Sequence, residues 1–150
     1  MPPEYEISAA ELLERVLAAL KKGDVAAALT DMDELIKLDR SPSNCAQLGF
    51  CLASVRGEYK AAAALCHEAI KRDPKNPDHY YQQGRVLLLA GRKKDAIWVM
   101  RMGLRQGTHK EMAALLLKLG TRNQPAIPFL RRENPINKHL GLLMKKLRMR

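Results

Sequence analysis

With 150 residues, 47% of them hydrophobic, the chain has the size of one compact domain with a continuous core. No apolar run approaches the roughly 20 residues of a membrane-spanning helix, and the acidic N-terminus lacks the positive start of a secretory signal. Three cysteines, Cys45, Cys51 and Cys66, form an odd set without metal-ligand spacing. They indicate reduced, buried thiols in a cytoplasmic protein.

The net charge of +10 is unevenly distributed along the chain. Residues 1–83 hold 10 basic and 13 acidic residues, a net charge of −3, whereas residues 84–150 hold 16 and 3, a net charge of +13. This asymmetry points to an acidic partner, an anionic membrane surface or nucleic acid near the C-terminal end.

Capping residues predict where the helices begin. Ser8 followed by Glu11 has the spacing of a capping box, in which each side chain bonds a free amide of the first turn. Ser41 and Asn76 each precede a proline, which suits the first helical position because its missing amide hydrogen costs nothing there. The predicted helices span residues 9–21, 25–38, 42–55, 59–72, 77–90 and 93–106. They follow a lead of residues 1–8, and the short turns between them predict antiparallel pairs.

A fixed period organises these helices. Three glycines stand 34 residues apart, at Gly23, Gly57 and Gly91, and each is followed five residues later by an alanine, at Ala28, Ala62 and Ala96. Glycine supplies the backbone conformation that a tight turn between helices requires, and a small side chain lets two helices cross closely. A period between about 20 and 50 residues indicates a stack of repeated units.

The residues at these positions resemble the tetratricopeptide repeat. The middle unit shows the pattern most fully, with Leu48, Gly49, Leu52, Gly57, Tyr59, Ala62, Ala69 and a closing Asp73-Pro74-Lys75-Asn76. The third unit has Tyr80, Gly84, Leu87, Gly91, Ala96 and Gly103, and the more divergent first unit has Leu12, Val16, Gly23, Ala28 and Leu35. The resemblance implies an all-α solenoid, a right-handed superhelix of three antiparallel helix pairs, over residues 9–42, 43–76 and 77–110.

Two departures from the family pattern concern the register and the end of the units. Gly49 lies eight residues before Gly57, whereas Gly84 lies seven before Gly91, which predicts one extra residue in the turn of the middle unit. The third unit ends at Gly107-Thr108, where the family would place a proline. The sequence therefore allows two alignments of the middle unit with the other units, which differ by one residue.

The C-terminal part is expected to close the stack and to extend beyond it. Thr108 with Glu111 has capping-box spacing, and a capping helix is predicted over residues 111–120, where it would cover the apolar end of the repeats. Residues 121–150 follow as a proline-containing linker and a basic amphipathic helix that Asn134-Pro135 opens.

The tail leaves several interpretations open. The dense apolar residues between Pro125 and Leu130 predict that the linker folds back onto the stack. The final helix can lie on an anionic membrane surface through Lys138, Lys145, Lys146, Arg148 and Arg150. It can instead pack on the repeats or on a second subunit, with its lysines in water. Nucleic acid is disfavoured, because Phe129 is the one aromatic residue of the tail that could stack a base.

The resemblance also implies a binding surface, because in that family the first helix of each pair lines a concave groove that takes peptides. Carried over by register, the residues that face the groove here are Leu13, Leu17, Phe50, Ser54, Tyr81, Arg85 and Leu88. The set is largely apolar with one cation. Leu13 and Leu17 stand where some relatives carry side chains that bind the terminal carboxylate of a chaperone, so that clamp is not expected.

No catalytic constellation is visible, because the four histidines lie on different elements without serine, cysteine or carboxylate partners at a recognisable spacing. We therefore expect a non-enzymatic, cytoplasmic adaptor or scaffold, without cofactor or metal, that binds an unidentified protein or peptide. One alternative is a chaperone for an exported protein, similar to the three-repeat chaperones of type III secretion. Another is a peripheral membrane organiser, and self-association is left open.

Overall fold

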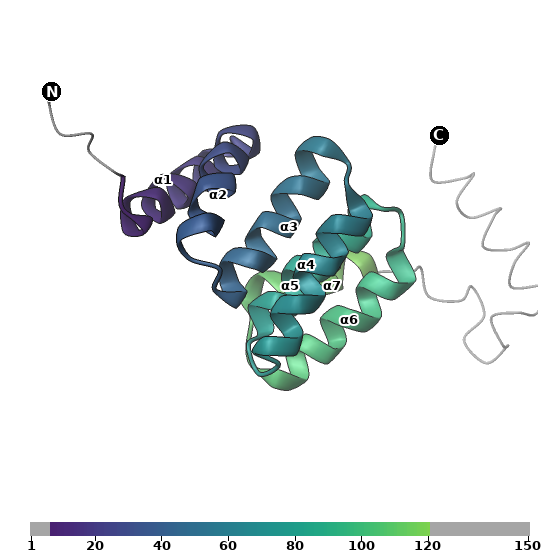
Figure 1. The fold of residues 1–150 in the computed structure, drawn as a ribbon. Helices are drawn as coiled ribbons and strands as arrows, with labels where there is room; N and C mark the ends of the chain where they lie inside the picture. Colours follow the sequence, from purple (N-terminus) through teal and green to yellow (C-terminus); the bar gives the residue numbers. More distant parts are fainter. Residues whose placement is uncertain (1–6, 121–150) are drawn as a thin grey trace, which may run out of the picture. The chain divides into compact units, whose positions relative to one another are not determined.

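The computed structural model describes residues 7–120, which form seven helices without a strand in that range (Figure 1). Two compact units divide the chain, Met1–Leu117 and Lys118–Arg150. The helices are α1 (Ala9–Lys22), α2 (Val25–Leu38), α3 (Pro42–Arg56), α4 (Tyr59–Arg72), α5 (Pro77–Leu89), α6 (Lys93–Gln106) and α7 (Lys110–Gly120). The predicted all-α architecture is confirmed, and the bounds of the six paired helices agree with the predictions to within one residue. The linker and the basic helix predicted for the tail lie outside the described residues.

The helices begin where their capping side chains satisfy free backbone amides. At α1, Ser8 Oγ accepts a hydrogen bond from the Glu11 amide at 3.2 Å, and the Glu11 carboxylate accepts one from the Ser8 amide at 3.0 Å. Ser41 caps α3 and Asn76 caps α5, each directly before a proline. These three predicted starts are confirmed.

The start of α7 differs from the prediction. The helix begins at Lys110, so its cap is His109, whose Nδ1 accepts a hydrogen bond from the Met112 amide at 3.1 Å. The predicted capping box of Thr108 with Glu111 is therefore wrong. The physical reason is that Glu111 is the second residue of the helix, where its carboxylate cannot reach back to close the box.

The three repeated glycines end the first helix of each pair. Gly23, Gly57 and Gly91 have φ angles of 80°, 68° and 76°, a left-handed conformation that favours glycine. After α1 and α5 this conformation closes a Schellman turn, in which the Asp24 amide donates to the Ala19 carbonyl at 2.9 Å and the Arg92 amide to the Leu87 carbonyl at 2.8 Å.

The extra residue of the middle unit lies in a helix and not in the turn. Helix α3 has 15 residues and runs directly into Gly57, whereas α5 has 13 residues and is followed by Ala90 before Gly91. The prediction of a longer turn is therefore wrong. Helical hydrogen bonding continues through the additional residue, so the register of α3 is shifted relative to its turn by one position.

Each of the helices from α1 to α6 packs on its neighbours among these six along the chain, and α3 and α5 also pack on each other. The close crossings occur at the small residues that the repeat predicted. Ala28, Ala62 and Ala96 are each 0% exposed. A Cβ atom built on Gly49 of α3 would lie 2.7 Å from the Ala62 carbonyl oxygen of α4, so only a glycine fits there without a shift.

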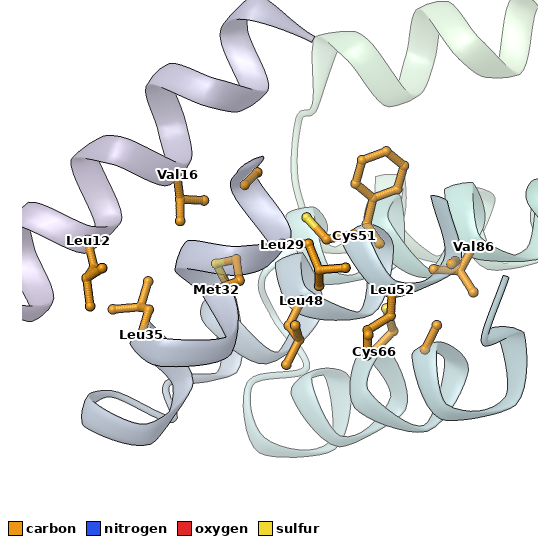
Figure 2. Close-up of a cluster of buried hydrophobic side chains, with 14 residues drawn as sticks. Leu12, Val16, Leu29, Met32, Leu35, Leu48, Cys51, Leu52, Cys66 and Val86 are labelled. Carbon is orange, nitrogen blue, oxygen red and sulfur yellow. The ribbon is translucent and has the colours of Figure 1, made fainter. Parts of the chain in front are cut away.

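The core continues from the first helical pair into the second and third. Figure 2 shows Leu12 and Val16 of α1 directed toward Leu35 and Met32 of α2. The same cluster extends to Leu48, Cys51, Leu52, Cys66 and Val86 on α3, α4 and α5. All three cysteines are free and buried, and burial raises the pKa of Cys66 to about 12. None of the described helices is both long and apolar enough to cross a bilayer.

One buried histidine couples the stability of the fold to pH. His79 on α5 is 1% exposed, and its Nε2 atom lies 3.4 Å from Oδ2 of Asp73. Burial lowers the pKa of His79, and the Asp73 carboxylate offsets part of that effect. The unfolded chain therefore binds a proton at a higher pH than the folded chain does, so neutral His79 contributes stability that is present above about pH 6.5 and lost below it.

We predict that the free energy of unfolding falls as the pH is lowered below about 6.5, and that His79→Gln flattens this fall. Urea unfolding at each pH, followed by circular dichroism, measures the effect. The matched control is His67→Gln, because His67 is exposed on α4 and should leave the pH dependence as in the wild type. An equal slope for His79→Gln and the wild type would contradict the prediction.

Candidate functional site

The predicted groove residues fall into two groups in the structure. Phe50 on α3 is buried, and three residues on α5, namely Tyr81, Arg85 and Leu88, are half-buried. Leu13, Leu17 and Ser54 are exposed. The structure therefore concentrates the predicted site on α3 and α5, which pack against each other.

Arg85 is the centre of a cluster on these two helices. Its Cζ atom lies 3.3 Å from the centroid of the Phe50 ring and 5.3 Å from the centroid of the Tyr81 ring. A cation this close to an aromatic face is attracted by the electron density of the ring. One Nη1 proton is donated to Oε1 of Gln82 at 3.2 Å. We call these four residues the Arg85 cluster.

The charge of Arg85 is not neutralised within the described part of the chain. No carboxylate there lies within ion-pair distance of its guanidinium. Desolvation by burial lowers the pKa of Arg85. The remaining guanidinium protons can therefore bind an anionic group of a ligand, while the half-buried ring of Tyr81 offers apolar surface.

A side-chain hydrogen bond ties the cluster across the two helices. Nε2 of Gln82 on α5 donates to Oε1 of Gln47 on α3 at 3.1 Å. Because the Gln82 oxygen accepts from Arg85 at the same time, this amide fixes the orientation of the guanidinium relative to α3.

The start of α7 extends the cluster on the other side. The ring of His109 lies 4.6 Å from the ring of Tyr81, and its Nε2 atom lies 2.9 Å from Oδ1 of Asp78. Since Nδ1 already accepts the Met112 amide, the Nε2 proton is donated to the Asp78 carboxylate. The carboxylate of Asp78 is therefore engaged by His109, and the ring of Tyr81 on α5 contacts the cap of α7.

Sequence reasoning missed four of these residues: Gln47, Asp78, Gln82 and His109. A signal existed for the two glutamines, because they are 35 residues apart, as are Gly49 and Gly84. Stacked repeats place equivalent positions side by side. His109 had no such signal, because the capping residue of this helix was predicted one position earlier, at Thr108.

Several predicted groove residues are not joined to the cluster. Among the described residues, α1 packs on α2, and it is α2 rather than α1 that packs extensively on α3. Leu13 and Leu17 therefore remain on a separate exposed face, and Ser54 is exposed near the end of α3. The basic residues predicted for an anionic surface, Lys138, Lys145, Lys146, Arg148 and Arg150, lie outside the described residues.

The groups of the Arg85 cluster determine which ligands it can contact. Within residues 7–120, no group of three His, Cys, Asp or Glu side chains is arranged to hold a metal ion. The Arg85 cluster supplies a partly desolvated cation that Gln82 orients and the half-buried ring of Tyr81, which together suit an extended segment bearing an apolar and an anionic group.

Comparison with known proteins gives one family. The tetratricopeptide repeat model matches residues 56–119, which run from the turn of the middle unit through α7. A search of the curated proteins finds no match to the chain.

Proposed function

We propose that this chain, which belongs to the tetratricopeptide repeat family, is an adaptor that binds a peptide segment of a partner protein against α3 and α5. Such repeats generally mediate protein–protein interaction and are typically non-catalytic. The observation that carries the proposal is the guanidinium of Arg85, stacked on Phe50 without a carboxylate partner among the described residues.

The energetics favour a ligand that combines apolar and anionic contacts. Arg85 is already desolvated and oriented by Gln82, so a ligand carboxylate gains a charge-assisted hydrogen bond without ordering a flexible side chain. The half-buried ring of Tyr81 contributes area burial, which salt hardly weakens. We therefore predict that binding depends only weakly on salt between low and physiological concentration.

The test is an affinity pull-down with the full chain and with an Arg85→Glu, Tyr81→Ala variant, followed by mass spectrometry and titration of the captured segment. We expect the variant to lose the partner, because it loses both the cation and a ring of the cluster. Matched control substitutions are Lys37→Glu and Tyr59→Ala, which change exposed residues of the same kinds on α2 and α4. A partner that Tyr81→Ala leaves bound, and whose affinity collapses with salt, would contradict the proposal.

A cytoplasmic location is part of the proposal. It is supported by Cys45, Cys51 and Cys66, which are buried as free thiols in the folded chain. Thiols are kept in that state in the cytosol, whereas oxidising compartments favour disulfides.

A further inference from the structure

The outward faces of α4 and α6 carry cations at positions that are equivalent in the second and third repeats. On each helix, four exposed residues follow the spacing i, i+4, i+7 and i+11, which places them along one stripe. They are Lys60, Ala64, His67 and Lys71 on α4, and Lys94, Trp98, Arg101 and Arg105 on α6. Each residue of the second stripe lies 34 positions after its counterpart in the first. We call the eight residues the basic face.

The position of these stripes is set by the buried sides of the same helices. Ala62, Cys66 and Ala69 of α4 are fully buried, as are Ala96 and Met100 of α6. Both helices pack against α5, so one scaffold carries the two stripes (Figure 1). The opposite sides of α4 and α6 therefore face solvent.

The cations of the basic face are not neutralised by the residues around them. The acidic residues within the two helices are Glu68 and Asp95. Glu68 pairs with Arg40 and Arg72, and Asp95 pairs with Arg92. Among the described residues, no ion pair involves the five Lys and Arg residues of the stripes, so their charges are available to an external anion.

Trp98 distinguishes this face from an ordinary solvated one. Its side chain is 63% exposed, and it stands between Lys94 and Arg101 on the stripe. An indole has a large apolar body and one polar group, so it favours the boundary between water and the lipid headgroups of a membrane. Lysine and arginine around it would meet the phosphates of the same headgroups.

We propose that the basic face binds the surface of an anionic phospholipid bilayer. A bilayer requires exposed cations and an aromatic residue at the interface, which the stripes of α4 and α6 provide. Single-stranded nucleic acid would need several aromatic rings to stack successive bases, and the face has one. Each cation near an anionic surface strengthens binding about fivefold. The surface is distinct from the Arg85 cluster and does not depend on the proposed peptide binding.

Trp98 is the one tryptophan of the chain, so its fluorescence reports on this face alone. The experiment titrates the full chain with phosphatidylcholine vesicles that contain or lack about 30% phosphatidylserine. We expect the emission to shift to shorter wavelength with the anionic vesicles only. Bromine on the acyl chains of the lipid should quench it, because bromine quenches an indole that lies within the bilayer interface.

A charge-reversal variant measures the contribution of the cations. Arg101→Glu with Arg105→Glu should weaken vesicle binding by at least about 25-fold, taking about fivefold for each cation lost. The matched control is Lys21→Glu with Lys22→Glu, which makes the same charge change at the exposed end of α1 and should bind within a fewfold of the wild type.

Three results would overturn the proposal. Vesicle binding without a change in Trp98 emission would place the lipid contact elsewhere on the chain. Equal losses of vesicle affinity in the two charge-reversal variants would mean that binding depends on the net charge of the chain and not on the position of the cations. An RNA oligonucleotide that shifts Trp98 emission, where anionic vesicles do not, would assign the face to nucleic acid.

Discussion

Replacing Met32 with alanine is expected to lower the free energy of unfolding by about 2 to 5 kcal/mol. Met32 lies on α2 and is 0% exposed, in the cluster that joins the first helical pair to α3 and α4. Alanine removes most of its buried side chain and leaves a cavity that the surrounding helices cannot fully close. Urea unfolding followed by circular dichroism measures the loss as a lower transition midpoint.

The control for Met32→Ala is Leu17→Ala, because Leu17 on α1 is 56% exposed and its truncation should change stability by less than about 0.5 kcal/mol. The comparison tests whether the first pair belongs to the cooperative fold. If Met32→Ala unfolded at the wild-type midpoint, α1 and α2 would contribute nothing to the transition of the stack.

Replacing Gly49 with alanine is expected to destabilise the chain by overpacking the crossing of α3 and α4. The new Cβ atom would lie 2.7 Å from the Ala62 carbonyl oxygen and 2.8 Å from Sγ of Cys66. Overpacking costs about 1 to 3 kcal/mol. We expect the upper half of that range, because a backbone carbonyl can only move together with its helix. This exceeds the roughly 0.5 to 1 kcal/mol that alanine gains over glycine in a helix.

Gly120→Ala is the matched control for Gly49→Ala, because a Cβ atom on Gly120 at the end of α7 meets no atom of residues 7–119 within 4 Å. The same chemical change should there be neutral or slightly stabilising, as judged by thermal unfolding of both variants. Wild-type stability of Gly49→Ala would mean that α3 and α4 cross less closely than the structure shows.

The helices could be predicted from the sequence because their ends depend on local interactions. Ser8, Ser41 and Asn76 cap the amides within a few residues of themselves, and Gly23 takes the left-handed conformation within its own turn. A single sequence contains all the partners of such contacts. His109 escaped prediction because histidine is not among the residues that usually cap a helix.

The candidate site could be predicted only in part, because its contacts join different helices. The sequence placed Phe50, Tyr81 and Arg85 on inner helices, but it did not show that the guanidinium stacks on the Phe50 ring. That contact depends on how α3 and α5 are packed and on the hydrogen bond from Gln82 to Gln47. Leu13 and Leu17 were grouped with them because the family register assumes that α1 and α3 are neighbours.

The extra residue inside α3 gives the two sides of the stack different spacings along the chain. Before the extra residue, equivalent positions of the middle and third units lie 35 residues apart, so Phe50 corresponds to Arg85. After it they lie 34 apart, as Lys60 and Lys94 do. Suppose that residues are transplanted from the middle unit to the third unit with the single offset of 34. Residues on the outward helices then reach equivalent positions, but residues on the inner helices are rotated by about 100°, the turn of one helical residue. Each surface of this protein must therefore be aligned by its own spacing.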